Sequence, residues 1–581
     1  MPRRLAQTIP NRSMTMTETR SPTLLALTAA VTFALAACGG DFDNSLPQLG
    51  AATGASLTSC TDLTTRASFA NTVFTAASAV AAGTLTVAGA PVPAHCQLTG
   101  RMFDRTSTVD GKNYAIGFEM RLPNAWNGRF FYQANGGTDG SVVTATGPAD
   151  GGPTPTNALA MGFAVISSDA GHNAAQNPTF GIDPQARLDY GYQAVAKLTP
   201  MAKAVIQTAY GKGPDRSYIG GCSNGGRHTL VAASRYADQY DGFLAGDPGW
   251  RLPLAATANI AGFQTYLSLA TNPADASTGF TAAERQLVSN AVTAKCDALD
   301  GVADGLIADT TACQAAFDLN RDVPTCTGAR DGTCLSAAQK TGIAKLIAGA
   351  TTSTGTRIYS SWPFDNGLGT GGWAFWKFTV PAILDSGAVG FIWQVPPADP
   401  ATFNGPVFAA TSSVDTLYAK IQATNATYTE NSLSFMTPPN PTDLSLLKHR
   451  GAKVMIYHGT SDPIFSSDDS VAYIEGLRAA NGGDASNFAR LYLIPGMNHC
   501  SGGPTTDKFD MLTPLVDWVE KGQAPESVVA SARGASDPAG KNADVPASWA
   551  PNRTRPLCSY PKVARYNGSG SIEVATSFTC Q

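Results

Sequence analysis

The chain has 581 residues, a formal net charge of −4 and a hydrophobic fraction of 43%. This length is enough for a large core, as two domains or as one domain with a big insertion. The small net charge and the lack of a long lysine- or arginine-rich run exclude the basic footprint of a nucleic-acid-binding protein, so we expect no nucleic-acid partner.

The first 38 residues have the pattern of an export signal and are kept out of the fold prediction. Several arginines precede an apolar run over residues 24–37, which is too short for a convincing membrane span. The run ends in Leu-Ala-Ala-Cys-Gly at residues 35–39, which resembles a bacterial lipobox with Cys38 as the lipidated residue; ordinary signal cleavage nearby is the alternative. We therefore expect an exported protein that is secreted, periplasmic or anchored to the outer membrane only through this lipid, with a linker over residues 39–59.

Strands alternate with helices over the first part of the mature chain, residues 60–249. Residues 116–122, 129–133, 163–167 and 217–219 are predicted strands, whereas residues 189–208 and 226–236 are predicted helices. This alternation favours an α/β fold with a doubly wound, largely parallel sheet.

The alternation breaks over residues 250–446, where helices are predicted at 281–298 and 336–348 among loops and aromatic-rich stretches. Strand patterns return at residues 453–459 and 489–494. The simplest arrangement is an α/β-hydrolase core, residues 60–249 and 447–581, interrupted by a large inserted lid domain.

Ten cysteines remain when Cys38 is set aside from the eleven in the chain. An even number in an exported protein suggests five disulfides. Sequence neighbours suggest Cys60–Cys96, Cys296–Cys313, Cys326–Cys334 and Cys558–Cys580, which leaves Cys222 and Cys500 as a long bridge. Spacing alone leaves other connectivities open, and the lack of a C-x-x-C motif disfavours zinc.

The chemistry is predicted from residues 221–225, which have the sequence Gly-Cys-Ser-Asn-Gly of a nucleophile elbow. A serine hydroxyl is a poor nucleophile until a histidine takes its proton, and His499 follows the last predicted strand. Asp462 follows the strand before it, which gives the chain order Ser223, Asp462, His499. Asp468 and Asp469 are rival acids. The alternative role for Asp462 is that of a turn or helix N-cap aspartate, and for His499 that of a structural loop histidine.

Acyl transfer also needs hydrogen-bond donors for the oxyanion that develops on the carbonyl oxygen. The backbone N–H of Asn224, next after the serine, is the expected first donor. The second should come from the glycine-rich turn after the strand at residues 129–133, where we favour Gly137 and keep Gly136 as the alternative; ordinary turn glycines are the bland interpretation. No organic cofactor is expected.

Three motifs resemble the tannase and feruloyl esterase family of serine esterases: residues 221–226, residues 457–462 (Tyr-His-Gly-Thr-Ser-Asp) and residues 495–503 (Pro-Gly-Met-Asn-His-Cys-Ser-Gly-Gly). The resemblance runs from about Cys60 to the C-terminus. It extends to the mono(2-hydroxyethyl) terephthalate hydrolase branch through residues 129–131, 181–188 and 507–516. In this family the cysteine before the serine pairs with the cysteine after the histidine, so the resemblance implies a Cys222–Cys500 bridge.

The family resemblance also implies a structural Ca²⁺ in the lid. Its acidic loop matches residues 297–306, where Asp297, Asp300 and Asp304 would supply carboxylates and Val302 and Leu306 backbone carbonyls. Without the resemblance this loop would be only a solvated acidic turn.

The lid is rich in aromatic residues, which suit a flat aromatic acyl group, and we expect Phe375 and Phe465 to contact a small aromatic ester. The terephthalate branch has a lid arginine that clamps the substrate carboxylate, but its position aligns near Gly387, and no arginine lies between Arg357 and Arg450. Lys377 is a possible substitute. The sequence thus predicts an esterase for aromatic acids, with terephthalate-monoester hydrolysis and a non-catalytic aromatic-ester-binding lipoprotein as the alternatives.

Overall fold

The computed structural model describes residues 46–148, 154 and 156–581. The predicted export signal, Cys38 and the first part of the linker lie outside these residues. Leu46–Gln581 form a single unit. Among the described helices, none has the length and apolar character that crossing a bilayer requires.

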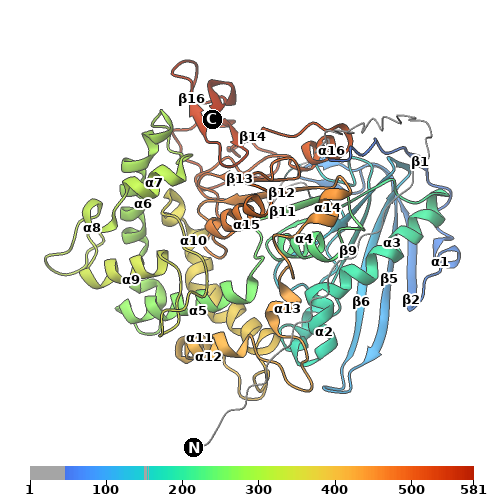
Figure 1. The fold of residues 1–581 in the computed structure, drawn as a ribbon, viewed down its shortest axis with the longest axis horizontal. Helices are drawn as coiled ribbons and strands as arrows, with labels where there is room; N and C mark the ends of the chain where they lie inside the picture. Colours follow the sequence, from blue (N-terminus) through green and yellow to red (C-terminus); the bar gives the residue numbers. More distant parts are fainter. Residues whose placement is uncertain (1–45, 149–153, 155) are drawn as a thin grey trace, which may run out of the picture. The chain divides into compact units, whose positions relative to one another are not determined.

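The main sheet has nine strands in the order β13-β12-β11-β10-β8-β9-β6-β5-β2 (Figure 1). Neighbouring strands from β13 to β9 pair in parallel, as predicted, whereas β9, β6, β5 and β2 pair antiparallel. The strands are β2 (Thr72–Val80), β5 (His95–Thr106), β6 (Asn113–Pro123), β8 (Arg129–Gln133), β9 (Ala164–Ser168), β10 (Arg216–Cys222), β11 (Gly242–Gly246), β12 (Lys453–Gly459) and β13 (Ala489–Ile494). The α/β class is confirmed, and the antiparallel extension is an addition to it.

Helices cover both faces of the sheet because successive strand residues point to opposite sides. On one face, Ile219, Phe243 and Val454 pack with helices α3 (Ala194–Tyr210), α4 (Asn224–Arg235) and α15 (Ser467–Ala480). On the other, Tyr218 and Leu244 pack with α16 (Leu512–Lys521). Both cores meet at the parallel strands, so the carboxyl ends of β8, β10, β11, β12 and β13 are held rigidly together.

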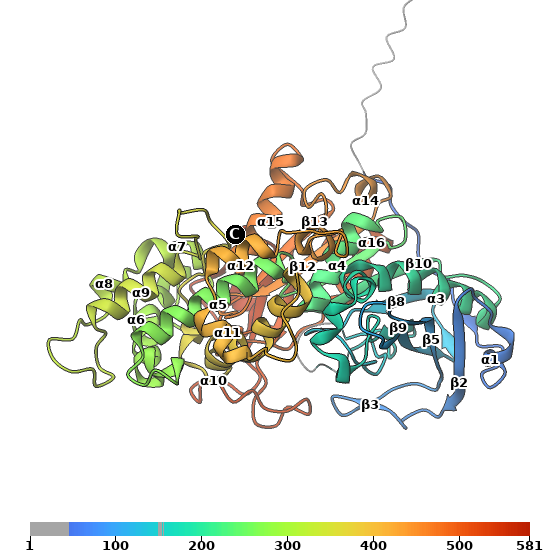
Figure 2. The same ribbon diagram turned by 90° about the horizontal axis from the view of Figure 1, so that it is seen from below.

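Ten α-helices lie between β11 and β12, the segment predicted as the lid. They are α5 (Leu252–Leu269), α6 (Ala282–Cys296), α7 (Thr310–Ala316), α8 (Leu319–Asp322), α9 (Ala337–Ile347), α10 (Gly371–Ala374), α11 (Gly405–Thr411), α12 (Val414–Lys420), α13 (Ser432–Met436) and α14 (Ser445–His449). In both views α6, α8 and α9 lie beside the sheet, away from β2 and β5 (Figures 1 and 2).

Three wide-turn π-helical stretches follow α10: η7 (Phe375–Thr379), η8 (Pro381–Asp385) and η9 (Ala388–Trp393). Such stretches are rare and often occur at functional sites. Nothing in the apolar pattern of residues 371–393 distinguishes them from an α-helix.

Five disulfides are present, with the pairing expected from the sequence: Cys60–Cys96, Cys222–Cys500, Cys296–Cys313, Cys326–Cys334 and Cys558–Cys580. Four are local, and Cys222–Cys500 spans 278 positions of the chain. This long bridge joins the end of β10 to the loop after β13.

Candidate active site

Ser223 lies in the sharp turn between β10 and α4, with a backbone φ of 66° and ψ of −126°. Glycines make this turn possible, because a Cβ on Gly221 or Gly225 would lie 2.1 or 2.3 Å from the carbonyl oxygen of Ala134. The turn has the geometry of a nucleophile elbow and presents the serine hydroxyl at the carboxyl edge of the sheet.

The three predicted catalytic side chains meet at this edge. His499 Nε2 lies 2.8 Å from Ser223 Oγ, and His499 Nδ1 lies 2.7 Å from Asp462 Oδ2. Asp462 and His499 come from the loops after β12 and β13, and both are buried. The imidazole is therefore placed to take the serine proton while the carboxylate orients it.

The second oxygen of the Asp462 carboxylate accepts hydrogen bonds from the N–H groups of Ile464 and Phe465, at 2.9 and 3.0 Å. His458 Nε2 approaches the first oxygen to 3.4 Å. Burial opposes ionisation of Asp462, but the imidazoles of His499 and His458 beside it hold its pKa well below the ordinary value. His458 thus lies directly beside the acid.

The rival acids are engaged elsewhere. Asp468 and Asp469 lie in the first turn of α15. Asp468 Oδ2 accepts a hydrogen bond from Ser361 at 2.6 Å, and Asp469 pairs with Arg251. The geometry selects Asp462.

Asp247 is a functional neighbour that the sequence did not single out. Its Oδ1 accepts the N–H of Gly459 at 2.7 Å, and its Oδ2 accepts the N–H of Cys500 at 3.0 Å. Burial raises the pKa of Asp247 to about 6. This carboxylate and the Cys222–Cys500 bridge together fix the loop that carries His499 to the ends of β10, β11 and β12.

The predicted oxyanion donors lie beside the serine. Asn224 is the first residue of α4, where backbone N–H groups have no partner within the helix. Gly136 and Gly137 both line the pocket in front of Ser223. A Cβ on Gly136 would lie 3.8 Å from the Ser223 Cβ, whereas one on Gly137 would meet nothing within 4 Å, so the alternative glycine is nearer to the serine.

A buried polar network orients Asn224 and was not predicted. Asn224 Nδ2 donates to Asp139 Oδ2 at 2.9 Å, and Asn224 Oδ1 accepts from Arg227 Nε at 2.6 Å. His228 Nε2 lies 2.9 Å from the same Asp139 oxygen. Burial raises the pKa of Asp139 to about 7. Because these contacts join loops far apart in the chain, no local motif announces them.

An open pocket of about 510 Å³ gives access to Ser223. Its walls include Asn135, Val143 and Trp376, and the Trp376 ring packs edge-on against the His499 ring at 4.7 Å. None of the residues lining this pocket in the described chain is a lysine or an arginine. The surface in front of the serine therefore offers apolar and hydrogen-bonding contacts but no cation.

Neither of the two phenylalanines predicted to contact substrate lines the pocket in front of Ser223. Phe465 is buried, and its ring packs edge-on against His499 at 5.2 Å without lining the pocket. Phe375 is 48% exposed and packs on Trp376, outside the pocket lining. The aromatic residue of this stretch that lines the pocket is Trp376, the next residue along η7.

The predicted calcium loop lies at the end of α6. Asp297 Oδ1 accepts the N–H groups of Asp304 and Gly305, at 3.0 and 2.9 Å, and Asp304 pairs with Arg555. Burial, with the neighbouring carboxylates of Asp304 and Asp297, raises the pKa of Asp300 to about 7. Carboxylates and backbone carbonyls are hard oxygen donors suited to Ca²⁺. Asp297 and Asp304 would have to exchange their present partners to bind it, because the three carboxylates are not among the described groups whose ligand atoms lie within 4.8 Å of one another.

Among known proteins, residues 96–581 match the family described as tannase and feruloyl esterase. The chain is 41% identical over 539 residues to the mono(2-hydroxyethyl) terephthalate hydrolase of Piscinibacter sakaiensis, covering 85% of this chain and 86% of that protein. It is 28% identical over 486 residues to a probable feruloyl esterase B-1 of Neosartorya fischeri, covering 80% and 82%.

Among solved structures, feruloyl esterase B from Aspergillus oryzae superposes with a TM-score of 0.71 at 22% identity, covering 89% of this chain and 98% of that one. The tannin acyl hydrolase of Aspergillus niger superposes with a TM-score of 0.62 at 20% identity, covering 91% and 96%. At these identities the likeness describes the fold alone.

Proposed function

The chain belongs to the tannase and feruloyl esterase family of carboxylic ester hydrolases, and from this premise we propose that it cleaves esters of aromatic acids through an acyl-enzyme on Ser223. The observation that carries the proposal is the continuous hydrogen-bonded chain from Ser223 Oγ through His499 to Asp462, at 2.8 and 2.7 Å. That chain opens into a pocket walled by Trp376.

Ser223 Oγ attacks the ester carbonyl carbon as its proton passes to His499 Nε2, and Asp462 stabilises the imidazolium that forms. The N–H of Asn224, with that of Gly137 or the adjacent Gly136, binds the oxyanion. His499 then gives its proton to the leaving alcohol as the C–O bond breaks. Water attacks the acyl-enzyme, His499 takes its proton, and the free acid leaves with Ser223 restored.

The lack of a cation among the lining residues favours acyl groups without a negative charge. A substrate carboxylate placed in this pocket would lose hydration without gaining an ion pair. We therefore propose neutral aromatic acyl groups, such as hydroxycinnamates or gallates, as the preferred substrates. The 41% identity to the terephthalate-monoester hydrolase supports the alternative.

A matched pair of esters separates these candidates: mono(2-hydroxyethyl) terephthalate and 2-hydroxyethyl benzoate, which differ only in the second carboxylate. We expect kcat/KM to be at least about tenfold higher for the benzoate. The terephthalate carboxylate would lose its hydration without gaining a charge-assisted hydrogen bond, and one such bond is worth about a factor of ten. Methyl ferulate and methyl gallate complete the panel, and Ser223→Ala supplies the blank. A tenfold preference for the terephthalate would establish the alternative, and no turnover of any ester beyond the blank would refute the aromatic-ester proposal.

We further propose that Asp297, Asp300 and Asp304, with the carbonyls of Val302 and Leu306, hold a structural Ca²⁺. The supporting observation is that these three acidic residues share one loop, where burial and the like charges of Asp304 and Asp297 raise the pKa of Asp300 to about 7. A cation there would neutralise the loop and brace the lid, with no part in the ester chemistry.

Export is proposed as well, since five disulfides are typical of an oxidising compartment. Lipidation of Cys38 remains a prediction from the sequence. Labelling of bacteria with a radioactive fatty acid tests it: the protein should be labelled and membrane-associated, and Cys38→Ala should be neither. An unlabelled, soluble wild-type protein would support ordinary signal cleavage instead of lipidation.

A further inference from the structure

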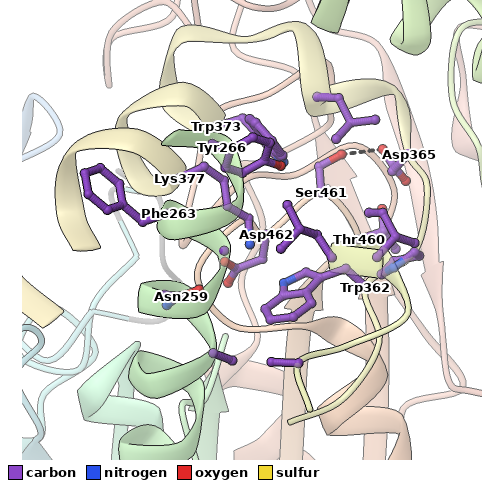
Figure 3. Close-up of a pocket in the computed structure, with 17 residues that line it drawn as sticks. Asn259, Phe263, Tyr266, Trp362, Asp365, Trp373, Lys377, Thr460, Ser461 and Asp462 are labelled. Carbon is purple, nitrogen blue, oxygen red and sulfur yellow. Dashed lines mark hydrogen bonds between the residues drawn. The ribbon is translucent and has the colours of Figure 1, made fainter. Parts of the chain in front are cut away.

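A second cavity has the catalytic acid in its lining but neither Ser223 nor His499. It has a volume of about 40 Å³ and is lined by Asp462 and its neighbours Thr460 and Ser461, by residues of α5, and by Trp362, Trp373 and Lys377 of the lid (Figure 3). By volume it has room for about two to four water molecules, at about 10–15 Å³ each. Its lining is largely apolar, with one lysine.

Lys377 reaches into this cavity from η7, toward the carboxylate of Asp462 (Figure 3). Its Nζ lies 4.1 Å from the centroid of the Trp362 ring, a cation–π arrangement. Among the described residues, Nζ forms no ion pair within 4.0 Å and no hydrogen bond, so its charge faces the cavity without a direct partner. A charge in such surroundings acts over a longer range than one in water.

The same short segment packs on the triad histidine and lines the cavity that the triad aspartate also lines. Trp376 packs on the ring of His499, and its neighbour Lys377 faces Asp462 from behind. A π-helical turn turns less per residue than an α-helical one, which helps two adjacent side chains to face the same part of the core. The lid therefore contributes to the electrostatics of the triad as well as to its cover.

We propose that Lys377 is a positioning residue of the triad: its ammonium, held in the cavity behind Asp462, opposes protonation of His499 and so keeps the general base available in mildly acidic solution. The inference rests on the proposed function of this triad. It differs from a substrate clamp, because Lys377 does not line the pocket in front of Ser223.

Several other ionisable groups lie around the cavity. Burial lowers the pKa of Lys377 to about 7, and the carboxylates of Asp462 and Asp385 oppose this shift. Burial raises the pKa of Asp385 to about 7 and also raises that of Asp365. The further neighbours are Tyr266 in the lining, Arg285 over Trp373 and Phe378, and His458 and Asp247 beyond Asp462. Of these groups, only Lys377 puts a cation into the cavity.

The test is the pH profile of kcat/KM with a chromogenic acetate ester, compared between wild type and Lys377→Met. Below neutral pH the wild-type ammonium opposes protonation of the imidazole, so its removal should raise the acid-side midpoint by roughly 0.5–1 pH unit. The plateau should not fall, because the same charge also disfavours the imidazolium of the transition state. The profiles should converge above pH 8, where wild-type Lys377 is neutral.

Two variants make the comparison decisive. Lys377→Arg keeps the charge and should restore the wild-type midpoint. Lys345→Met removes an exposed lysine of α9 from the same lid and should leave the profile unchanged. The Lys377→Met shift should persist in 0.5 M NaCl, since buried charges are screened much less than exposed ones.

An unchanged midpoint in Lys377→Met, or an equal loss of kcat/KM at every pH, would overturn the proposal and leave Lys377 a packing residue. Either result requires an active wild-type enzyme, so it stays distinct from a failure of the proposed esterase function.

Stability gives a second readout that does not depend on turnover. In the unfolded chain a lysine keeps its proton to about pH 10.4, whereas burial lowers the pKa of Lys377 in the fold to about 7. Between these values the unfolded state binds more protons, so Lys377 makes the fold more stable as pH rises. The Tm of wild type minus that of Lys377→Met should increase from pH 7 to pH 10; a constant difference would contradict the buried ammonium.

Discussion

Asp462 holds the imidazole of His499 through one oxygen and two backbone N–H groups through the other. This arrangement leaves the carboxylate little freedom to rotate. It also requires an ionised acid, because an amide in its place would present the wrong group to one set of partners.

We expect Asp462→Asn to lower kcat by about 10⁴-fold, because the amide favours the wrong imidazole tautomer. Asp468→Asn is the matched control, since Asp468 was the rival acid in the sequence and instead accepts a hydrogen bond from Ser361. Its kcat should stay within about threefold of wild type. Steady-state kinetics at pH 8 measure both, and equal losses would contradict the assignment.

Some residues of the site could be predicted from the sequence and others could not. Ser223, Asp462 and His499 could be predicted because each follows a recognisable strand in a fixed order. Asp139, Asp247 and Trp376 could not, because their contacts with the site depend on loops that only the folded sheet brings together. A lone aspartate in a turn has no local pattern that marks it.

At the scale of elements, the site depends on the ends of four parallel strands. β10 carries the nucleophile, β12 the acid and β13 the base, with β11 between β10 and β12. β13 is therefore three strands away from the elbow, and the loop after it reaches back across the sheet edge, where the Cys222–Cys500 bridge holds the two Cα atoms 6.1 Å apart.

Replacing both Cys222 and Cys500 by alanine should lower kcat/KM by about 10–100-fold, because a displacement near 1 Å between reacting groups costs on that order. Replacing Cys326 and Cys334 is the control, since that bridge closes only an eight-position separation within the lid. It should leave kcat/KM unchanged. Wild-type activity in the first variant, with loss of the bridge verified by mass spectrometry, would show that packing alone holds the triad.

Element prediction succeeded where periodicity was clear and failed where several structures share one pattern. The bounds of β8, β12 and β13 agree with those predicted, because short apolar runs between turns are typical of buried parallel strands. β2 and β5 were missed, since β2 has a half-exposed edge pattern without regular alternation. The π-helical stretches were also missed, since their composition suits an ordinary helix.

On the scale of the whole molecule, the lid is attached to the core through its acidic loop. Arg555 of β15 (Thr554–Cys558) pairs with Asp304, and Arg565 pairs with Asp309 while donating to the Leu299 carbonyl at 3.0 Å. A structural ion at this loop would therefore couple the lid to the C-terminal part of the core.

If the proposed Ca²⁺ is bound, EDTA should lower the Tm by several degrees, since a ligand specific to the folded state stabilises it by mass action. Added CaCl2 should restore the Tm, whereas MgCl2 should not, because Mg²⁺ demands a smaller octahedral site. Asp300→Asn should show a low Tm that responds to neither EDTA nor CaCl2. Differential scanning calorimetry measures the effects of EDTA, of added metal and of Asp300→Asn. A wild-type Tm that does not respond to EDTA, with no bound calcium by elemental analysis, would refute the calcium proposal.

The insertion between β11 and β12 has a consequence for protein engineering. Since Trp376 and Lys377 sit in the inserted segment but face His499 and Asp462 of the core, a transplanted lid would bring its own neighbours to the catalytic pair. Chimaeras between family members should therefore inherit the donor's pH dependence of activity on the acid side together with its ester preference, so that the two properties are transferred together.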